Sequence, residues 1–203
     1  MTAKSKKTSS KQQPTLKTKG GRVVVLSSTL AYRGPLFDIY TDYIREPGGG
    51  DSRRDVIRHC GSVVILAIDD TRNRKDPLVL LERQYRHAAG RYMLELPAGK
   101  KEANEASLHG AKRELIEETG YRARRWTKLL RFYASPGFLG EWMQIYLAED
   151  LSQGATSPDE DEYIQCQWVP LSQALDWIET NKIMDGKTMI ALLHYDRLRR
   201  SRK

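Results

Sequence analysis

Cysteine is scarce in this chain. Two of the 203 residues are cysteines, Cys60 and Cys166, and they form neither a CxxC pair nor a cluster with histidine. This scarcity argues against a zinc site and against a framework of disulfides. Because each cysteine stands within an apolar run, we expect two buried free thiols in a reducing cytoplasm.

Long apolar runs are missing as well. No stretch approaches the roughly 18 uninterrupted apolar residues that a membrane-spanning helix needs. The first 21 residues are rich in Lys, Ser, Thr and Gln and lack the apolar core of a signal peptide. We therefore expect neither membrane contact nor export, and a cytoplasmic location.

Acidic residues are absent from both ends of the chain. Residues 1–22 carry seven Lys or Arg and residues 197–203 carry five, without any Asp or Glu. The remaining 22 basic and 26 acidic residues make the middle slightly acidic, although the formal net charge is +8. The basicity therefore belongs to tails at 1–21 and 197–203. We expect solvated tails, the first of them disordered, rather than a nucleic-acid-binding surface.

The apolar pattern divides the rest of the chain into two parts. In residues 22–58, β-branched and aromatic runs broken by Gly and Pro predict a small antiparallel sheet of about three strands. Residues 59–196 predict a larger domain that includes a buried central strand at Gly61–Asp69 and ends in two helices, near Leu171–Thr180 and Lys187–Arg200. Because so small a sheet buries little surface alone, we expect it to pack against the main domain or a second subunit.

The most informative stretch runs from Gly99 to Tyr121 and reads GKKEANEASLHGAKRELIEETGY. Most residues in its second half are helix formers. Asn104 or Ser107 could cap the start of this helix, and Gly120 could end it. The stretch therefore predicts a loop, a helix and a turn.

Three glutamates share one face of this predicted helix: Glu114, Glu117 and Glu118. Carboxylates packed together beside a buried face repel one another and resist desolvation, and a divalent cation reverses that effect. Oxygen ligands without Cys or His favour Mg²⁺ or Mn²⁺. Arg113, four residues before Glu117, can hold a carboxylate in place through its planar fork. The alternative is a solvated helix on which these charged side chains face solvent and bind no metal.

The complete spacing G-x5-E-x7-R-E-U-x-E-E-x-G-U, where U is a bulky apolar residue, is met here, with Tyr121 as the one soft match. This pattern resembles the signature of the Nudix hydrolases. The order of strands and helices already favours an α+β fold. The resemblance implies an α/β/α sandwich around a mixed sheet, and hydrolysis of a nucleoside diphosphate linked to another group. It also implies Mg²⁺, or Mn²⁺, held by Ala98, Glu114, Glu117 and Glu118, with Arg113 and Glu105 orienting the cluster.

Other segments resemble the ADP-ribose pyrophosphatase branch of this family. Pro136 stands sixteen residues after Gly120, LELPAGK precedes the signature, and SPGF follows it. This resemblance implies cleavage of ADP-ribose to AMP and ribose 5-phosphate. It places the general base on the loop before the last strand, where Glu160 and Glu162 are the candidates, with Glu160 preferred by its spacing to Ile164. It also implies a homodimer whose subunits exchange the N-terminal sheet.

Further roles follow from the same resemblance. Glu141, which follows SPGF, is expected to contact a metal or a water. The resemblance also makes Phe37 or Tyr40 a candidate for stacking on a base. Arg86 is a candidate for binding phosphate oxygens because of its guanidinium alone, and the alternative is a surface arginine. Two sets summarise these assignments. The catalytic candidates are Glu160, Glu162, Arg113 and Glu117, and the substrate-binding candidates are Arg86, Glu95, Pro136, Phe37 and Tyr40.

Three alternatives stay open at this stage. The substrate could be GDP-mannose or another nucleotide sugar. The protein could be a non-catalytic sensor that binds ADP-ribose. Such sensors usually have an eroded signature or an attached DNA-binding domain, whereas the signature here is intact and the sequence outside the main domain predicts no helix-turn-helix unit. It could also hydrolyse RNA caps or RNA 5′ ends with help from its basic tails. One departure from the branch is His59-Cys60-Gly61 in place of His-Pro-Gly, which leaves the local turn in question.

Overall fold

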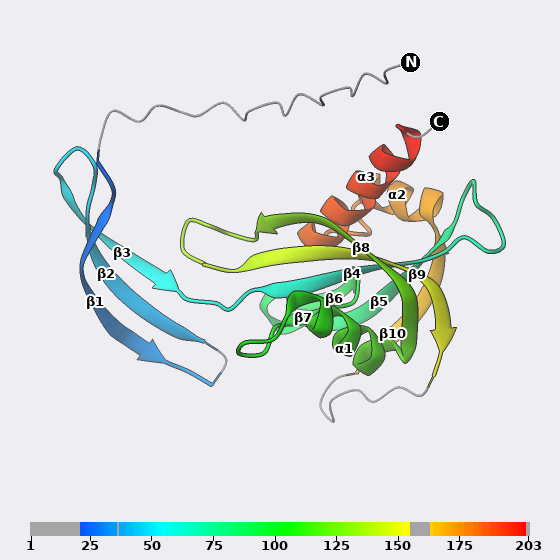
Figure 1. Cartoon of the computed structure of the whole chain (residues 1–203), viewed down its shortest axis with the longest axis horizontal. Coiled ribbons are helices and arrows are strands. Elements are labelled where there is room, and N and C mark those ends of the chain that lie inside the picture. Colours follow the sequence, from blue (N-terminus) through cyan, green and yellow to red (C-terminus); the bar gives the residue numbers. More distant parts are fainter. Residues whose placement is uncertain (1–20, 36, 155–162, 202–203) are drawn as a thin grey trace, which may run out of the picture.

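The computed structural model describes residues 21–35, 37–154 and 163–201, arranged as two sheets and three helices (Figure 1). The two candidates for the general base, Glu160 and Glu162, lie outside the described residues, as does nearly all of the basic N-terminal tail. None of the helices in the described part has the length and apolar character needed to span a bilayer.

A three-stranded antiparallel sheet is formed near the N-terminus, as predicted. Its strands are β1 (Val24–Arg33), β2 (Asp38–Arg45) and β3 (Asp51–Ile57), in that order across the sheet. Every residue of β1 is exposed to solvent. The sheet stands to one side of the main body and is joined to it through the end of β3 (Figure 1).

The main body contains a seven-stranded mixed sheet with the central order β10-β5-β4-β9-β8, in which β6 also pairs with β5 and β7 with β4. The pair β4 and β9 is parallel, and the other pairs are antiparallel. The strands are β4 (Ser62–Asp69), β5 (Leu78–Arg86), β6 (Arg91–Glu95), β7 (Ala98–Lys100), β8 (Tyr121–Tyr133), β9 (Trp142–Gln153) and β10 (Gln165–Pro170). The helices are α1 (Ser107–Thr119), α2 (Leu171–Glu179) and α3 (Gly186–Arg200), with a short 3-10 turn at His87–Ala89.

Helices cover both faces of this sheet. The run from Val63 to Ala67 in β4 is fully buried, which confirms the predicted central strand. Its odd-numbered residues pack with Leu115 of α1, and its even-numbered residues pack in the cluster that contains Leu192 of α3. Because successive strand residues point to opposite faces, this alternation needs an apolar layer on each side. The expected α/β/α sandwich is therefore confirmed.

Two local expectations are wrong. The helix α1 begins at Ser107 with Ala106 at the N-cap position, so neither Asn104 nor Ser107 caps it. Asn104 instead has a φ of 64° and belongs to the preceding loop. Both cysteines are exposed rather than buried, because Cys60 precedes β4 and Cys166 lies on the outermost strand, β10. Gly120 does end the helix in the left-handed conformation, as predicted.

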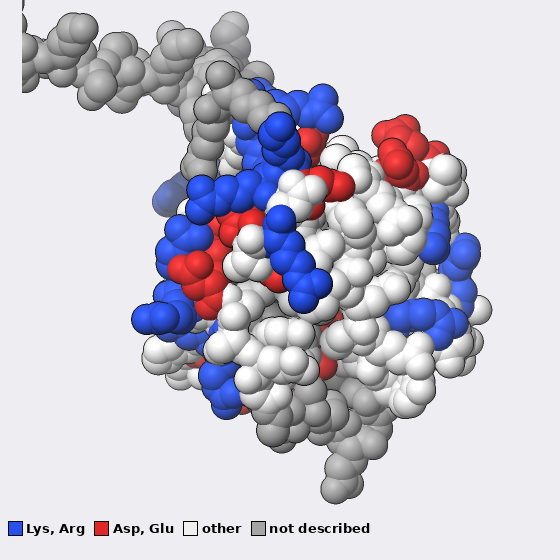
Figure 2. All heavy atoms as spheres, turned by 90° about the vertical axis from the view of Figure 1, so that its right-hand side faces the viewer, with Lys and Arg blue, Asp and Glu red and all other residues white. Residues whose placement is uncertain are grey.

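Basic and acidic side chains lie interspersed on the face shown in Figure 2. Ion pairs join such side chains in the β4–β5 loop, in α3, and between β8 and β9. They are Arg74 with Asp70, Arg200 with Asp196, and Arg125 with Glu149. Mixed charge of this kind differs from the clustered basic stripe that is typical of a nucleic-acid-binding surface.

Candidate active site

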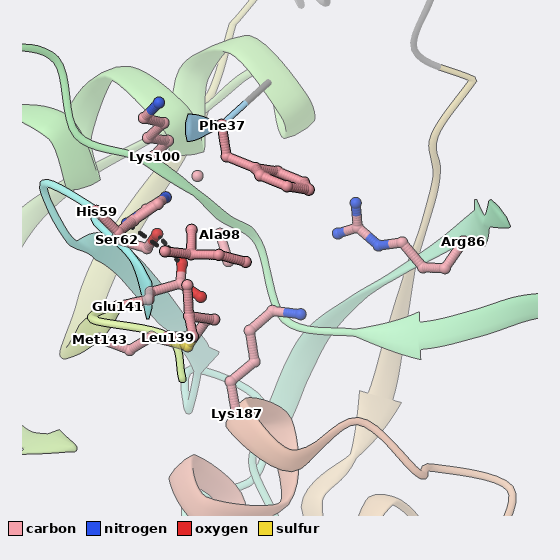
Figure 3. Close-up of a pocket in the computed structure, with 12 residues that line it drawn as sticks. Phe37, His59, Ser62, Arg86, Ala98, Lys100, Leu139, Glu141, Met143 and Lys187 are labelled. Carbon is pink, nitrogen blue, oxygen red and sulfur yellow. Dashed lines mark hydrogen bonds and ion pairs between the residues drawn. The ribbon is translucent and has the colours of Figure 1, made fainter. Parts of the chain in front are cut away.

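A cavity of about 370 Å³ lies where the linker after β3, the strands β4 and β7, and the loop before β9 meet (Figure 3). It combines an apolar part with several charged side chains. The lining residues are Phe37, Ile57, His59, Ser62, Arg86, Ala98, Gly99, Lys100, Leu139, Glu141, Met143 and Lys187. Such a mixture suits a ligand with both an apolar ring and anionic groups.

Two glutamates of α1 approach the backbone of β7 at the edge of this cavity. The Ala98 N–H donates a hydrogen bond to Glu118 Oε2 at 3.0 Å. A Cβ added to Gly99 would lie 2.0 Å from the carboxyl group of Glu114, so a larger residue there would displace this carboxylate from its place beside β7. Glu114 and Glu118 are 8% and 9% exposed. The structure therefore brings together Ala98, Glu114 and Glu118, three of the predicted metal ligands.

Arg113 holds the carboxylates around it in place. Its guanidinium lies 2.8 Å from Glu117 Oε2, 2.9 Å from Glu114 Oε1 and 3.2 Å from Glu105 Oε1. Burial opposes the charge of Arg113, but these partners outweigh burial and raise its pKa. The hydrogen bond from Arg113 in turn lowers the pKa of Glu105. The predicted orienting role of Arg113 and Glu105 thus has a direct geometric basis.

The chemistry of this donor set fits a hard divalent cation. Glu114, Glu118 and the Ala98 carbonyl offer only oxygen, which Mg²⁺ and Mn²⁺ prefer. Within the described ranges, no three His, Cys, Asp or Glu side chains already form a metal-binding group. Arg113 pairs with both Glu114 and Glu117 in this arrangement. Because Glu114 and Glu118 are the carboxylates that lie against β7, we treat them and the Ala98 carbonyl as the groups that would hold the ion.

Two cations face the cavity from another side. Arg86 forms a bidentate pair with Glu95, with both N–O distances at 2.9 Å. Lys187, at the start of α3, bonds to the same carboxylate and lies 3.1 Å from Asp185 Oδ1. The head groups of Arg86 and Lys187 point toward the hollow in Figure 3. Glu95 is 3% exposed and lies behind them, so it orients the cations and does not line the cavity.

Lys187 was missed by the sequence analysis. In the sequence it is one more lysine at the start of a helix, and its local pattern carries no signal. The fold places it beside Glu95, which is 92 residues away along the chain. Ser62 was missed for the same reason, because a lone serine before an apolar run resembles any strand start.

Glu95 should make the fold sensitive to acid. Burial acts to raise its pKa, but the hydrogen bonds and charges of Arg86 and Lys187 outweigh burial, so the pKa is lowered. A carboxylate with a lowered pKa stabilises the fold fully above its unfolded pKa of about 4.3, and this contribution is lost as the pH falls through the folded pKa. Urea titrations between pH 7 and pH 3 should show the free energy of unfolding falling below about pH 4.5.

The variant E95Q tests this assignment. It should lower stability at pH 7 by about 2 kcal/mol, less than for a fully buried pair because the Arg86 side chain is 41% exposed. It should also reduce the fall in the free energy of unfolding between pH 4.5 and pH 3, since the titrating group is gone. E179Q, which changes an exposed glutamate of α2, is the matched control and should leave the curve unchanged. An equal fall in the free energy of unfolding at acid pH for E95Q and wild type would contradict the role given to Glu95.

The wall opposite Arg86 carries His59, Ser62 and Glu141, which lie close together in Figure 3. The Ser62 hydroxyl donates to Glu141 Oε1 at 2.5 Å. The Gly61 N–H donates to His59 Nδ1 at 3.0 Å, and the same nitrogen is 3.8 Å from Glu141 Oε1. Glu141 therefore lines the cavity, where the sequence analysis expected a contact to metal or water.

The remaining substrate-binding candidates are divided. Phe37 lines the cavity and is 39% exposed. Tyr40 lines a neighbouring hollow, and the Arg58 guanidinium lies 4.1 Å over its ring. Pro136 lines a third hollow together with Phe138. Of these three candidates, the structure therefore brings only Phe37 to the cavity that holds Ala98 and Glu141.

The comparisons with known proteins agree with this site. Residues 58–191 match the NUDIX domain. The chain is 37% identical over 163 residues to the ADP-ribose pyrophosphatase of Bacillus subtilis (strain 168), covering 79% of this chain and 85% of the relative. It is 36% identical, with the same coverage, to the methanol dehydrogenase activator of Bacillus methanolicus. It is 34% identical over 177 residues to the GDP-mannose pyrophosphatase of Escherichia coli O1:K1 / APEC, covering 79% and 86%.

A solved structure shows the same fold. The crystal structure of an ADP compounds hydrolase superposes with a TM-score of 0.78 at 23% identity, covering 90% of this chain and 96% of that one. The sequence signature, the placement of its glutamates and the matched domain lead to one assignment. The chain belongs to the Nudix family and is a Nudix hydrolase similar to the ADP-ribose pyrophosphatases.

Proposed function

We propose that this protein hydrolyses ADP-ribose to AMP and ribose 5-phosphate, with Mg²⁺ as its cofactor. The observation that carries the proposal is the pair of buried carboxylates, Glu114 and Glu118, packed against the β7 backbone beside a cavity that also presents Arg86 and Lys187. The identity of 37% to an ADP-ribose pyrophosphatase supports the choice of substrate.

The roles of the residues follow from their positions. Arg86 and Lys187 would pair with oxygens of the pyrophosphate, which a guanidinium and an ammonium bind well. A divalent cation held by Glu114, Glu118 and the Ala98 carbonyl would neutralise further negative charge on that group. Water then attacks one phosphorus, and the bond from that phosphorus to the bridging oxygen breaks. The proton of the water passes to a base, for which Glu160 and Glu162 remain the candidates.

Phe37 is the better of the two candidates for stacking on the adenine. Its ring borders the cavity, whereas one face of the Tyr40 ring is taken by Arg58. Stacking of a base on an aromatic ring contributes about 1–3 kcal/mol, so F37A should raise KM for ADP-ribose about tenfold and change kcat little. Y40A should raise KM less than about twofold by the same reasoning. Steady-state kinetics would contradict this choice if Y40A had the larger effect on KM.

The N-terminal sheet supports the proposed homodimer. Its exposed large apolar residues include Val24, Val25, Leu26, Leu30 and Tyr32. An apolar surface of this kind is typical of a protein interface, and a second copy that exchanges this sheet would cover it. Light scattering should therefore give twice the 23.3 kDa mass of one chain. A monomer at micromolar concentration would contradict the exchange.

A panel of substrates tests the proposed activity. ADP-ribose, GDP-mannose and ADP-glucose are compared by kcat/KM with Mg²⁺, and the products are identified by chromatography. We expect ADP-ribose to be preferred and to yield AMP. GDP-mannose is the second candidate because a relative of that activity is 34% identical, and equal or faster turnover of GDP-mannose would overturn the choice. Tight binding of ADP-ribose without turnover would favour the alternative that the protein is a non-catalytic sensor of ADP-ribose.

A further inference from the structure

The end of β3, where the chain leaves the N-terminal sheet, is bonded to the loop that carries Glu141. The Ile57 N–H donates to the Phe138 carbonyl at 2.7 Å, and the Gly140 N–H donates to the Ile57 carbonyl at 2.9 Å. Ile57 and Leu139 form a parallel bridge between these two segments. The backbone immediately before Glu141 is therefore held by the end of β3.

The chain then passes from β3 into β4 at Ser62, whose backbone is fixed on both sides. Ser62 pairs with Met143 of β9 and with Lys100 of β7, and it is 6% exposed. Its hydroxyl donates to Glu141 Oε1 at 2.5 Å, within the range of hydrogen bonds from a hydroxyl to a carboxylate. A donor on so rigid a strand defines where the carboxylate oxygen lies.

His59 does not supply this hydrogen bond. Its Nδ1 accepts from the Gly61 N–H, so in the neutral ring this nitrogen has no proton to donate. The separation of 3.8 Å between His59 Nδ1 and Glu141 Oε1 is also too long for a hydrogen bond. The donor to the Glu141 carboxylate is therefore Ser62.

We infer that Ser62 is a positioning residue for hydrolysis, because it holds the Glu141 carboxylate at the wall of the cavity. The inference deepens the proposed function and rests on it. Ser62 also borders the cavity, but its hydroxyl hydrogen is donated to Glu141 Oε1, so its role is exerted through Glu141. Any effect of losing its hydroxyl should therefore disappear when Glu141 can no longer act.

A double-mutant cycle tests this dependence. S62A should lower kcat about tenfold with KM within about twofold, because a hydrogen bond to a charged group is lost. E141Q should lower kcat at least as much, and S62A in the E141Q background should cause no further loss. S62T, which keeps the hydroxyl, should restore most of the activity. S172A is the matched control, since Ser172 forms an equivalent bond with Asp76 at the start of α2 and does not line the cavity.

The outcomes separate this inference from the proposed function. Additive losses in S62A and E141Q would overturn it, as would a wild-type kcat for S62A together with a strong loss for E141Q. If the wild type turned over no member of the substrate panel, the proposed function would fail. Crystal structures of wild type and S62A would still test the positioning. A displaced Glu141 carboxylate supports the inference, and an unmoved one overturns it.

Discussion

E118Q should lower kcat for ADP-ribose about a thousandfold while the protein stays folded. The substitution removes the negative charge that would hold a divalent cation. It keeps an oxygen that can accept the hydrogen bond from the Ala98 N–H, which is 3.0 Å away in the wild type. The measurement is kcat at saturating ADP-ribose and Mg²⁺, with circular dichroism to verify folding.

E179Q again provides the matched control. It removes one exposed carboxylate from α2 and should leave kcat unchanged, which excludes a general effect of net charge. Turnover by E118Q near the wild-type rate would remove Glu118 from the metal site. It would also remove the main reason for treating this helix as catalytic.

G99A should lower kcat almost as much as E118Q, although it changes no polar group. The added Cβ would lie 2.0 Å from the carboxyl group of Glu114, so this end of the side chain must shift away from β7. Glu114 is paired with Arg113 at 2.9 Å, so the shift would also disturb this ion pair. We expect kcat to fall at least about a hundredfold, since small displacements of catalytic groups carry losses of that size.

Gly48 offers the comparison for G99A. A Cβ on Gly48 would meet no atom within 4 Å, so G48A should keep full activity. The Mg²⁺ concentration needed for half-maximal rate should rise in G99A and stay constant in G48A. An active G99A with an unchanged requirement for Mg²⁺ would show that Glu114 does not need this approach to β7.

Much of the fold could be predicted because local pattern and tertiary packing agree. The short, β-branched apolar run at Gly61–Asp69 predicted a strand buried on two faces, and the spacing of Glu114 and Glu118 placed both on one side of a helix. The end of that helix at Gly120 was also clear from its residue type. Its start was not, because Asn104, a residue type that often caps helices, lies in the preceding loop with a φ of 64°.

The rest of the site depends on contacts between distant segments. Lys187 and Glu95 meet only after α3 packs on the sheet, and Ser62 meets Glu141 across 79 positions of the chain. Neither pair can be predicted from the spacing of residues along the sequence. The position of Tyr40 beneath Arg58 is equally a product of the folded N-terminal sheet, so sequence reasoning could not separate it from Phe37.

Calorimetric titration of Mg²⁺ into the protein, with a non-hydrolysable analogue of ADP-ribose already bound, tests the central claim most directly. The account predicts saturable uptake by the wild type and its loss in E118Q, because the carboxylates of α1 would hold the ion against the bound pyrophosphate. Hydrolysis by a wild-type protein that takes up no Mg²⁺ or Mn²⁺, or equal uptake by E118Q, would contradict it.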